Sequence, residues 1–460
     1  MQQDLTHGSI TGRLLSMAAF IGIGLVFQTA YFLIDLYFVA GIGPTAIAGV
    51  GLAGTSFFLS MAAAQMISVG ALSLIARAIG GKRPEEAEAV YHQSMILALI
   101  LTVLTLVGGY LFARQGLALL AADADTAGQG AAYLYGFLPA LALMFPTNAM
   151  GAALRAAGVV KPTMLIQTGT VVLNALLAPV LIAGWGTGIP LGVFGAGLAS
   201  SIAAVVGFLG ALWVFNRVQT VIVGPLRLPR PDFAICRRII GIGLPSAGEF
   251  LLMFVTAGVV YGVIRHFGSE AQAGYGVGTR VMQAVFLPAM AVSFAVAPVA
   301  GQNFGAGRGD RVRETVRQAA LISTGLMICL TLLCQVEAET LIGLFARDPE
   351  VIHIGATFLR IISLNFVATG LIFTASGTFQ ALGDTRPALF GSGSRLITFA
   401  VPAIWLSTQP WARLEHVWWL SAASVALHML IALWFLRREL RLKLAHLPPS
   451  AAVAVAAPAV

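Results

Sequence analysis

The chain has 460 residues, of which 58% are hydrophobic and only 10% are charged. Soluble domains carry about 25% charged residues, so this composition excludes a protein that covers itself with a water-facing surface. The net charge of +8 lies in short segments between apolar runs, where positive-inside membrane topology explains it, so we expect no nucleic-acid partner. The three cysteines form no CxxC pair and give no disulfide framework.

The apolar segments predict twelve membrane-spanning helices, because one span needs about 20 mostly apolar residues. The first is longer than the apolar core of a signal peptide, so we expect it to be retained as a span. The fold class predicted is an all-α polytopic membrane protein. In chain order the predicted spans are 13–40, 46–75, 90–112, 131–156, 162–184, 191–216, 238–264, 271–301, 314–335, 353–382, 387–408 and 416–436.

The hydrophilic connections predict the domains and the orientation. The longest connection splits the spans six and six, into an N-terminal lobe (1–217), a cytoplasmic linker (218–237) and a C-terminal lobe (238–446). Residues 447–460 are of low complexity and are predicted to be disordered. Most of the 27 Lys and Arg residues lie in alternate loops on one side, which predicts that both termini are cytoplasmic.

A shift of 225 residues aligns the two halves without gaps. Gly43 falls on Gly268, and further matches share the same offset: Gly49 on Gly274, Gly80 on Gly305, Arg83 on Arg308, Gln93 on Gln318, Gly158 on Gly383 and Pro162 on Pro387. Because each half holds an even number of spans, the repeats are predicted to be parallel. Transporters of this kind bind substrate between the halves, although a duplicated scaffold without transport is the alternative.

Five motifs resemble the multidrug and toxic compound extrusion (MATE) family: YFLIDLYFVAGIGPTAIAGVG (31–51), NALLAP (174–179), GVFGAGLASS (192–201), PVAGQNFGAGRGDRVR (298–313) and FQALGDTRP (379–387). The second half has no strong acidic cluster, which is similar to the DinF-like branch. The resemblance implies two six-helix lobes around a V-shaped cavity in the inner membrane. It also implies a monomer that exports hydrophobic, often cationic, compounds against an inward proton or sodium gradient.

Three polar residues are predicted in the outer half of the first lobe. Asp35 lies about 8 Å from the outer end of its helix, and Asn174 and Ser200 lie about 14 Å from theirs. An acid inside the membrane is a functional candidate by default, and the resemblance implies cation or proton binding at these positions. The alternative is that Asp35 only hydrogen-bonds neighbouring helices. Family members that take sodium often have a second Asp where this chain has Ala178, which favours protons over sodium as the coupling ion.

The second lobe offers Glu249 near the membrane midplane, one turn after Pro245. It is either a second proton site, a counter-charge for a cationic substrate, or half of a structural ion pair with Arg280 or Arg395. The family's own acid lies further along this helix, so its role is not transferred. The usual proline of helix 1 is Phe20 here, which leaves Gly22 and Gly24 to permit bending.

Aromatic and methionine side chains are candidates for the cavity wall, because such surfaces suit promiscuous binding. They are Tyr31, Tyr37, Met253, Tyr261, Met282 and Phe286. His353 and His428 are expected to be structural. A lipid-linked precursor flippase is an alternative function, but it would need several arginines in the cavity. The chain has no HExxH or GxSxG motif, so we expect no enzyme and no cofactor or metal beyond the coupling H⁺ or Na⁺.

Overall fold

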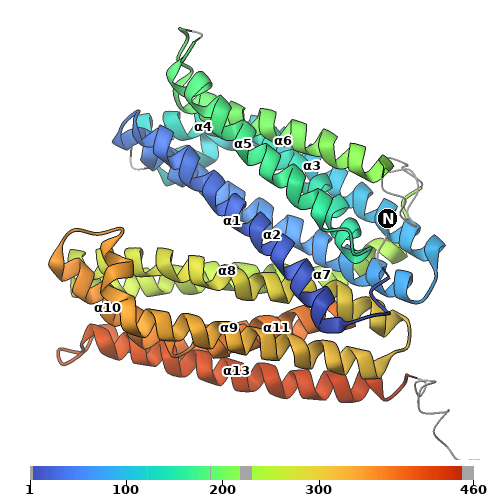
Figure 1. The fold of residues 1–460 in the computed structure, drawn as a ribbon. Coiled ribbons are helices and arrows are strands. Elements are labelled where there is room, and N and C mark those ends of the chain that lie inside the picture. The colour runs from blue at the N-terminus through green and yellow to red at the C-terminus, as the bar shows by residue number, and fades with distance from the viewer. Residues whose placement is uncertain (1–3, 122, 187, 218–229, 448–460) are drawn as a thin grey trace, which may run out of the picture. The chain divides into compact units, whose positions relative to one another are not determined.

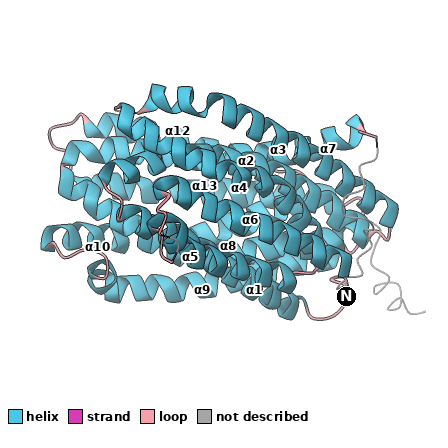
Figure 2. Ribbon diagram, turned by 90° about the horizontal axis from the view of Figure 1, so that it is seen from above, coloured by secondary structure: helices cyan, strands magenta, loops and turns pink. Residues whose placement is uncertain are grey.

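The computed structural model describes residues 4–121, 123–186, 188–217 and 230–447, without the side chains of residues 31–33, 35, 36 and 120. All regular secondary structure in these ranges is helical (Figure 2). Most of the predicted linker and the tail 448–460 lie outside the described residues. The helix that follows the linker begins at Phe233, a few residues before the position expected from the sequence.

The first six helices are α1 (Ile10–Ala40), α2 (Pro44–Gly80), α3 (Pro84–Leu120), α4 (Ala124–Ala156), α5 (Lys161–Ala183) and α6 (Gly192–Arg217). The others are α7 (Phe233–Ile264), η1 (Arg265–Phe267), α8 (Ser269–Gly305), α9 (Gly309–Gly343), α10 (Pro349–Ser363), α11 (Phe366–Leu382), α12 (Arg386–Ser407) and α13 (Leu414–Leu444). In the described chain, 11 helices are long and apolar enough to span a membrane, and α10 with α11 makes a twelfth. The predicted polytopic all-α class is therefore confirmed.

The structure divides into two compact units, and the division falls inside helices. The first unit consists mainly of Ile23–Gly243, and the second consists of Leu5–Gly22 together with the chain from Leu244 onward. The beginning of α1 is consequently part of the second unit, while the rest of α1 belongs to the first. Within the first unit, α6 packs against both α4 and α5 (Figure 1).

The repeat predicted from the sequence is present in the backbone. Helices α2 and α8 begin at Pro44 and Ser269 and end at Gly80 and Gly305, so both ends keep the 225-residue shift. Gly43 and Gly268, which precede these helices, share a positive φ of 147° and 106°. This conformation favours glycine because an L side chain would be strained there.

A close helix crossing is also repeated. A Cβ added to Gly49 of α2 would lie 2.6 Å from the Gly130 nitrogen of α4. A Cβ on Gly274 of α8 would lie 3.1 Å from the Gly355 nitrogen of α10, at the same shift. Small residues let helix backbones approach in membranes, where association depends on packing. Each unit therefore has its own glycine-lined crossing.

Helix α4 continues through Pro139, because neighbouring helices satisfy the groups that the proline frees. Pro139 cannot donate to the Tyr135 carbonyl one turn earlier. The Tyr110 hydroxyl of α3 donates to that carbonyl instead, at 3.3 Å. The Ser201 hydroxyl of α6 accepts a hydrogen bond from the Ala140 N–H at 3.2 Å. The proline thus adds contacts between helices without ending α4.

The related span of the second unit is broken, although it has no proline there. We predicted one helix over 353–382, but the structure has α10 and α11 with a bend of 55° between them. Leu364, the repeat partner of Pro139, lies in this break, and Asn365 caps α11 with φ −93° and ψ 0°. The single-helix prediction was wrong at this point, because no Gly or Pro marks the break in the sequence.

Candidate functional site

Helices α5 and α6 bring two of the predicted site residues together in the first unit. Asn174 and Ser200 are 0% and 1% exposed. The Asn174 Nδ2 donates a hydrogen bond to the Ser200 Oγ at 3.3 Å. The Asn174 Oδ1 is also buried and has no hydrogen-bond partner among the described residues. This leaves a buried polar acceptor without a partner in the described part of the chain.

An apolar cluster adjoins this pair and includes the C-terminal end of α1. The cluster contains Val39 of α1, Ala178 of α5 and Ala196 of α6. Each candidate residue lies four positions from the cluster residue on its own helix, toward the middle of that helix. The pairs are Asp35 with Val39, Asn174 with Ala178 and Ser200 with Ala196. Residues four apart share a helix face. The Asp35 side chain lies outside the described residues, so its position is known only along the helix.

In the second unit, Glu249 of α7 is paired with a hydroxyl. The Ser376 Oγ of α11 donates to the Glu249 Oε2 at 3.1 Å. Arg280 is exposed, and among the described residues Glu249 forms no ion pair with Arg280 or Arg395. The ion pair considered from the sequence is therefore absent from this conformation.

Arg395 of α12 lies in the interior of the second unit. Its Nε is buried and has no hydrogen-bond partner among the described residues. Tyr275 of α8 and His428 of α13 lie within electrostatic range of the guanidinium. His428 packs on Gly391, where an added Cβ would lie 2.5 Å from its Nε2. Tyr275 was missed by sequence reasoning, since nothing in its neighbourhood distinguishes it from a core aromatic residue.

The predicted cavity residues differ in their surroundings. Tyr37, Met253 and Tyr261 are 76%, 51% and 43% exposed. Met282 and Phe286 pack instead against the hydrophobic core of the second unit. The Tyr31 side chain lies outside the described residues. His353 lines a small hollow of about 140 Å³ with Arg413 and Trp418, and no group of side chains in the described chain could hold a metal.

Side chains of the second unit form hydrogen bonds with the backbone of the segment before α1. Sequence reasoning also missed these contacts. Leu5 is 0% exposed, and its N–H donates to the Gln302 Oε1 at 3.0 Å. The Asn303 Nδ2 donates to the Leu5 carbonyl at 3.2 Å, and the Arg308 Nη1 donates to the Thr6 carbonyl at 2.6 Å. These bonds fix the beginning of α1 to the α8–α9 turn.

Two repeated halves, each made of apolar helices long enough to span a membrane, define a polytopic membrane protein of the transporter type. The MatE family model matches residues 21–180 and 245–406, which together exceed half of the chain. The chain therefore belongs to the MATE family, and the resemblance drawn from the five motifs is confirmed.

Known relatives agree with this assignment. The multidrug export protein MepA of Staphylococcus haemolyticus is 27% identical over 375 residues, covering 80% of each chain. MepA of Staphylococcus aureus is 26% identical over 372 residues, again covering 80% of each. A MOP superfamily transporter from Pyrococcus furiosus has a TM-score of 0.88 at 24% identity, covering 95% of this chain and 98% of that one. A MATE structure in the straight conformation has a TM-score of 0.89 at 24% identity and the same coverage.

Proposed function

We propose that this protein exports hydrophobic or cationic organic compounds from the cell in exchange for an inward flow of protons. The family supports this, as do the MepA relatives, which are described as multidrug export proteins. The protein acts as a monomer in the cytoplasmic membrane with both termini in the cytoplasm, in keeping with its loop charges. No catalytic step is part of the cycle.

The observation that carries the choice of ion is the unpartnered Asn174 Oδ1 beside Ser200. A protonated carboxyl group can donate a hydrogen bond to such an oxygen, whereas an ionised carboxylate cannot. We assign Asp35 as the proton carrier. It lies one turn from Val39 on α1, just as Asn174 lies one turn from Ala178 on α5, and Val39 and Ala178 belong to the same apolar cluster. Sodium is the less favoured ion, because Ala178 supplies no second carboxylate.

Transport in proteoliposomes tests this function. Uptake of a fluorescent organic cation is measured under an imposed pH gradient or an imposed sodium gradient. We expect the pH gradient to drive uptake in the wild type and in Asp310→Asn, a control at an exposed acid of α9, but not in Asp35→Asn. Sodium stimulation at constant pH that disappears in Asp35→Asn would overturn proton coupling. Absence of exchange with both ions would overturn the antiporter.

The flippase alternative receives less support. A site for a lipid-linked anionic precursor would need several arginines directed inward. Of the two candidates predicted from the sequence, Arg280 is exposed and only Arg395 has a buried nitrogen. A single guanidinium suits one carboxylate better than it suits a diphosphate.

A further inference from the structure

Helices α6 and α13, the last helices of the two halves, carry the same pattern of exposed residues. The pattern is two aliphatic side chains, a tryptophan and an arginine, at successive intervals of three, four and four residues. Its members are Val206, Leu209, Trp213 and Arg217 on α6, and Leu427, Leu430, Trp434 and Arg438 on α13. Residues three or four positions apart share a helix face. Each helix therefore has one exposed stripe that is apolar and ends in an arginine.

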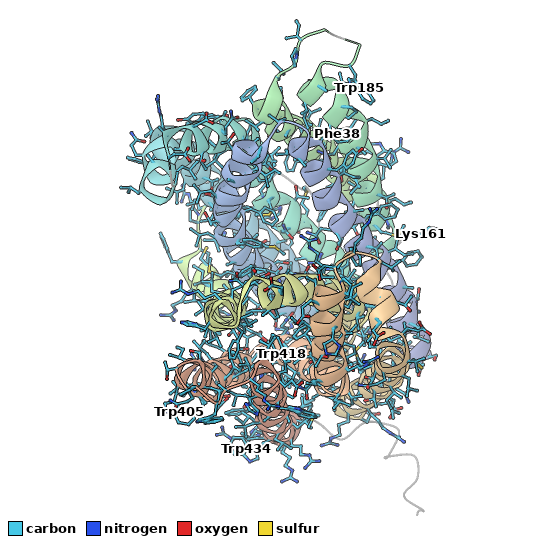
Figure 3. All side chains as sticks on the ribbon, turned by 90° about the vertical axis from the view of Figure 1, so that its left-hand side faces the viewer. Phe38, Lys161, Trp185, Trp405, Trp418 and Trp434 are labelled. Atoms are coloured by element: carbon cyan, nitrogen blue, oxygen red, sulfur yellow. The ribbon has the colours of Figure 1, made fainter. Side chains whose placement is uncertain are left out.

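The tryptophan and the arginine of each stripe are in contact. The Arg217 Cζ lies 5.4 Å from the centre of the Trp213 ring. The Arg438 Cζ lies 5.9 Å from the centre of the Trp434 ring, and Trp434 is labelled in Figure 3. The two tryptophans are 61% and 60% exposed. Because a guanidinium over an indole face is attracted to it, each arginine is held beside its ring at the protein surface.

Both contacts lie where the helix leaves its apolar span. The spans predicted from the sequence end at residues 216 and 436, so each tryptophan lies just inside the boundary and each arginine just outside it. Tryptophan favours the headgroup level of a bilayer. Arginine near a helix end extends its charged group toward the same level while its stem covers apolar surface. The two guanidinium groups are therefore at the depth of the lipid phosphates.

No acid of the described chain neutralises these arginines. Neither Arg217 nor Arg438 forms a salt bridge within the described residues. Glu439, which follows Arg438 in the chain, is 8% exposed and pairs with Lys443 at 3.3 Å. The exposed Arg441 lies about one turn beyond Arg438 and adds a second cation to the stripe on α13. Each stripe thus combines an apolar surface with a positive charge that the described chain leaves for an external anion.

We propose that each stripe binds one anionic phospholipid of the surrounding membrane. The guanidinium forms charge-assisted hydrogen bonds with the phosphate, the indole packs at the glycerol level, and the acyl chains lie along the aliphatic residues one and two turns deeper. A zwitterionic lipid has the same chains, but its ammonium group offsets the attraction between the phosphate and the arginine. The sites therefore select anionic lipid. This binding is separate from the export of organic compounds and is measured without transport.

Lipid retention by the purified protein tests the two sites. Phosphatidylglycerol and phosphatidylcholine with identical acyl chains are titrated into the protein in detergent, and native mass spectrometry counts the bound molecules. We expect the wild type to retain two phosphatidylglycerol molecules at concentrations that leave phosphatidylcholine unbound. Arg217→Gln and Arg438→Gln each weaken one site about fivefold, the effect of one arginine near anionic lipid, and retain one molecule. Arg313→Gln, at an exposed arginine of α9 without a tryptophan within four residues, retains both.

Glycerol phosphate separates a lipid site from a simple phosphate site. It has the headgroup charge without acyl chains, so we expect it to leave the bound phosphatidylglycerol in place. Displacement by glycerol phosphate, equal retention of the two lipids by the wild type, or two phosphatidylglycerol molecules on the double variant would each overturn the proposal. The substituted side chains are exposed, so all variants should keep the wild-type unfolding midpoint in lipid-free detergent. Added phosphatidylglycerol should raise this midpoint in the wild type and in Arg313→Gln, but not in the double variant.

Discussion

The Leu5 N–H donates to the side-chain oxygen of Gln302, which lies 297 residues away in the chain. Together with the bonds from Asn303 and Arg308, it attaches the segment before α1 to the second unit. Since the division between the units falls after Gly22, α1 begins in one unit and ends in the other.

Gln302→Met removes the acceptor while keeping the side-chain volume. It leaves the fully buried Leu5 N–H without this partner, which costs about 1–3 kcal/mol. We expect a lower thermal unfolding midpoint in detergent and faster proteolysis of the N-terminal segment. The control is Gln318→Met. The Gln318 amide donates to Glu314 on its own helix, so the change removes no hydrogen bond to another element within the described chain. Equal behaviour of the two variants would contradict the importance of this contact.

Gly49→Ala tests the crossing of α2 and α4. The new Cβ would overlap the Gly130 nitrogen and the Thr126 carbonyl oxygen, which are backbone atoms that cannot move aside. We expect a loss of about 1–3 kcal/mol in unfolding free energy, as for overpacked cores. Gly54→Ala, on the same helix with nothing within 4 Å of the new Cβ, should be neutral or stabilising. Denaturant unfolding of both variants measures the difference.

Ala178→Asp tests why protons are favoured over sodium. Ala178 is buried one turn after Asn174, so an aspartate there adds carboxylate oxygens beside the amide. We expect sodium to stimulate transport in this variant at constant pH, because a hard cation gains charged oxygen ligands. Ala178→Asn adds a polar group of the same size without the charge and should not respond to sodium. The same sodium response in both variants would show that the charge is not what matters.

Asp123, which caps α4, should make stability depend on pH in the acid range. The Thr126 N–H donates to its carboxylate at 2.7 Å and the Thr126 hydroxyl donates at 3.1 Å. These bonds hold the pKa of Asp123 below its ordinary value. A group with a depressed folded-state pKa stabilises the protein above its unfolded pKa, near 3.9, and loses this contribution as the pH falls through the folded value.

Asp123→Asn separates this effect from capping, because asparagine caps helices equally well but does not titrate. Between pH 5 and pH 3 we expect the wild type to lose more stability than the variant. Thermal unfolding across this range measures the difference. Parallel curves for the two proteins would mean that the carboxylate does not act through its charge.

Local features of the sequence predicted most of the fold. Long apolar runs predicted the spans, and a constant shift of 225 residues predicted the repeat. Both features can be read directly from the composition and the residue spacing of the chain. The break between α10 and α11 was not predictable in this way, since Leu364 stands where the first half has Pro139 in a continuous helix. Which helix breaks depends on partners such as Tyr110 and Ser201, and these are tertiary contacts.

The candidate site was predictable only in part. Asn174 and Ser200 were predicted at similar depths along their helices, because helical rise converts sequence position into depth. The hydrogen bond between them agrees with this placement. Depth says nothing about direction around a helix. This is why the sequence left open an ion pair of Glu249 with Arg280 or Arg395, which is not formed among the described residues in this conformation. The attachment of Leu5 to Gln302 joins residues that lie 297 positions apart in the chain and has no local signal.

The attachment of the N-terminal segment affects how the protein would behave if it were expressed as two fragments. If the chain were cut between Arg217 and Arg230 and expressed as two polypeptides, the first fragment would still carry Leu5–Gly22, which folds with the second fragment. The buried Leu5 and its hydrogen bond to Gln302 would then help to hold the two fragments together. Co-purification of the fragments should depend on these first residues and on the start of α7 up to Gly243, which the second fragment would carry although it belongs to the first unit.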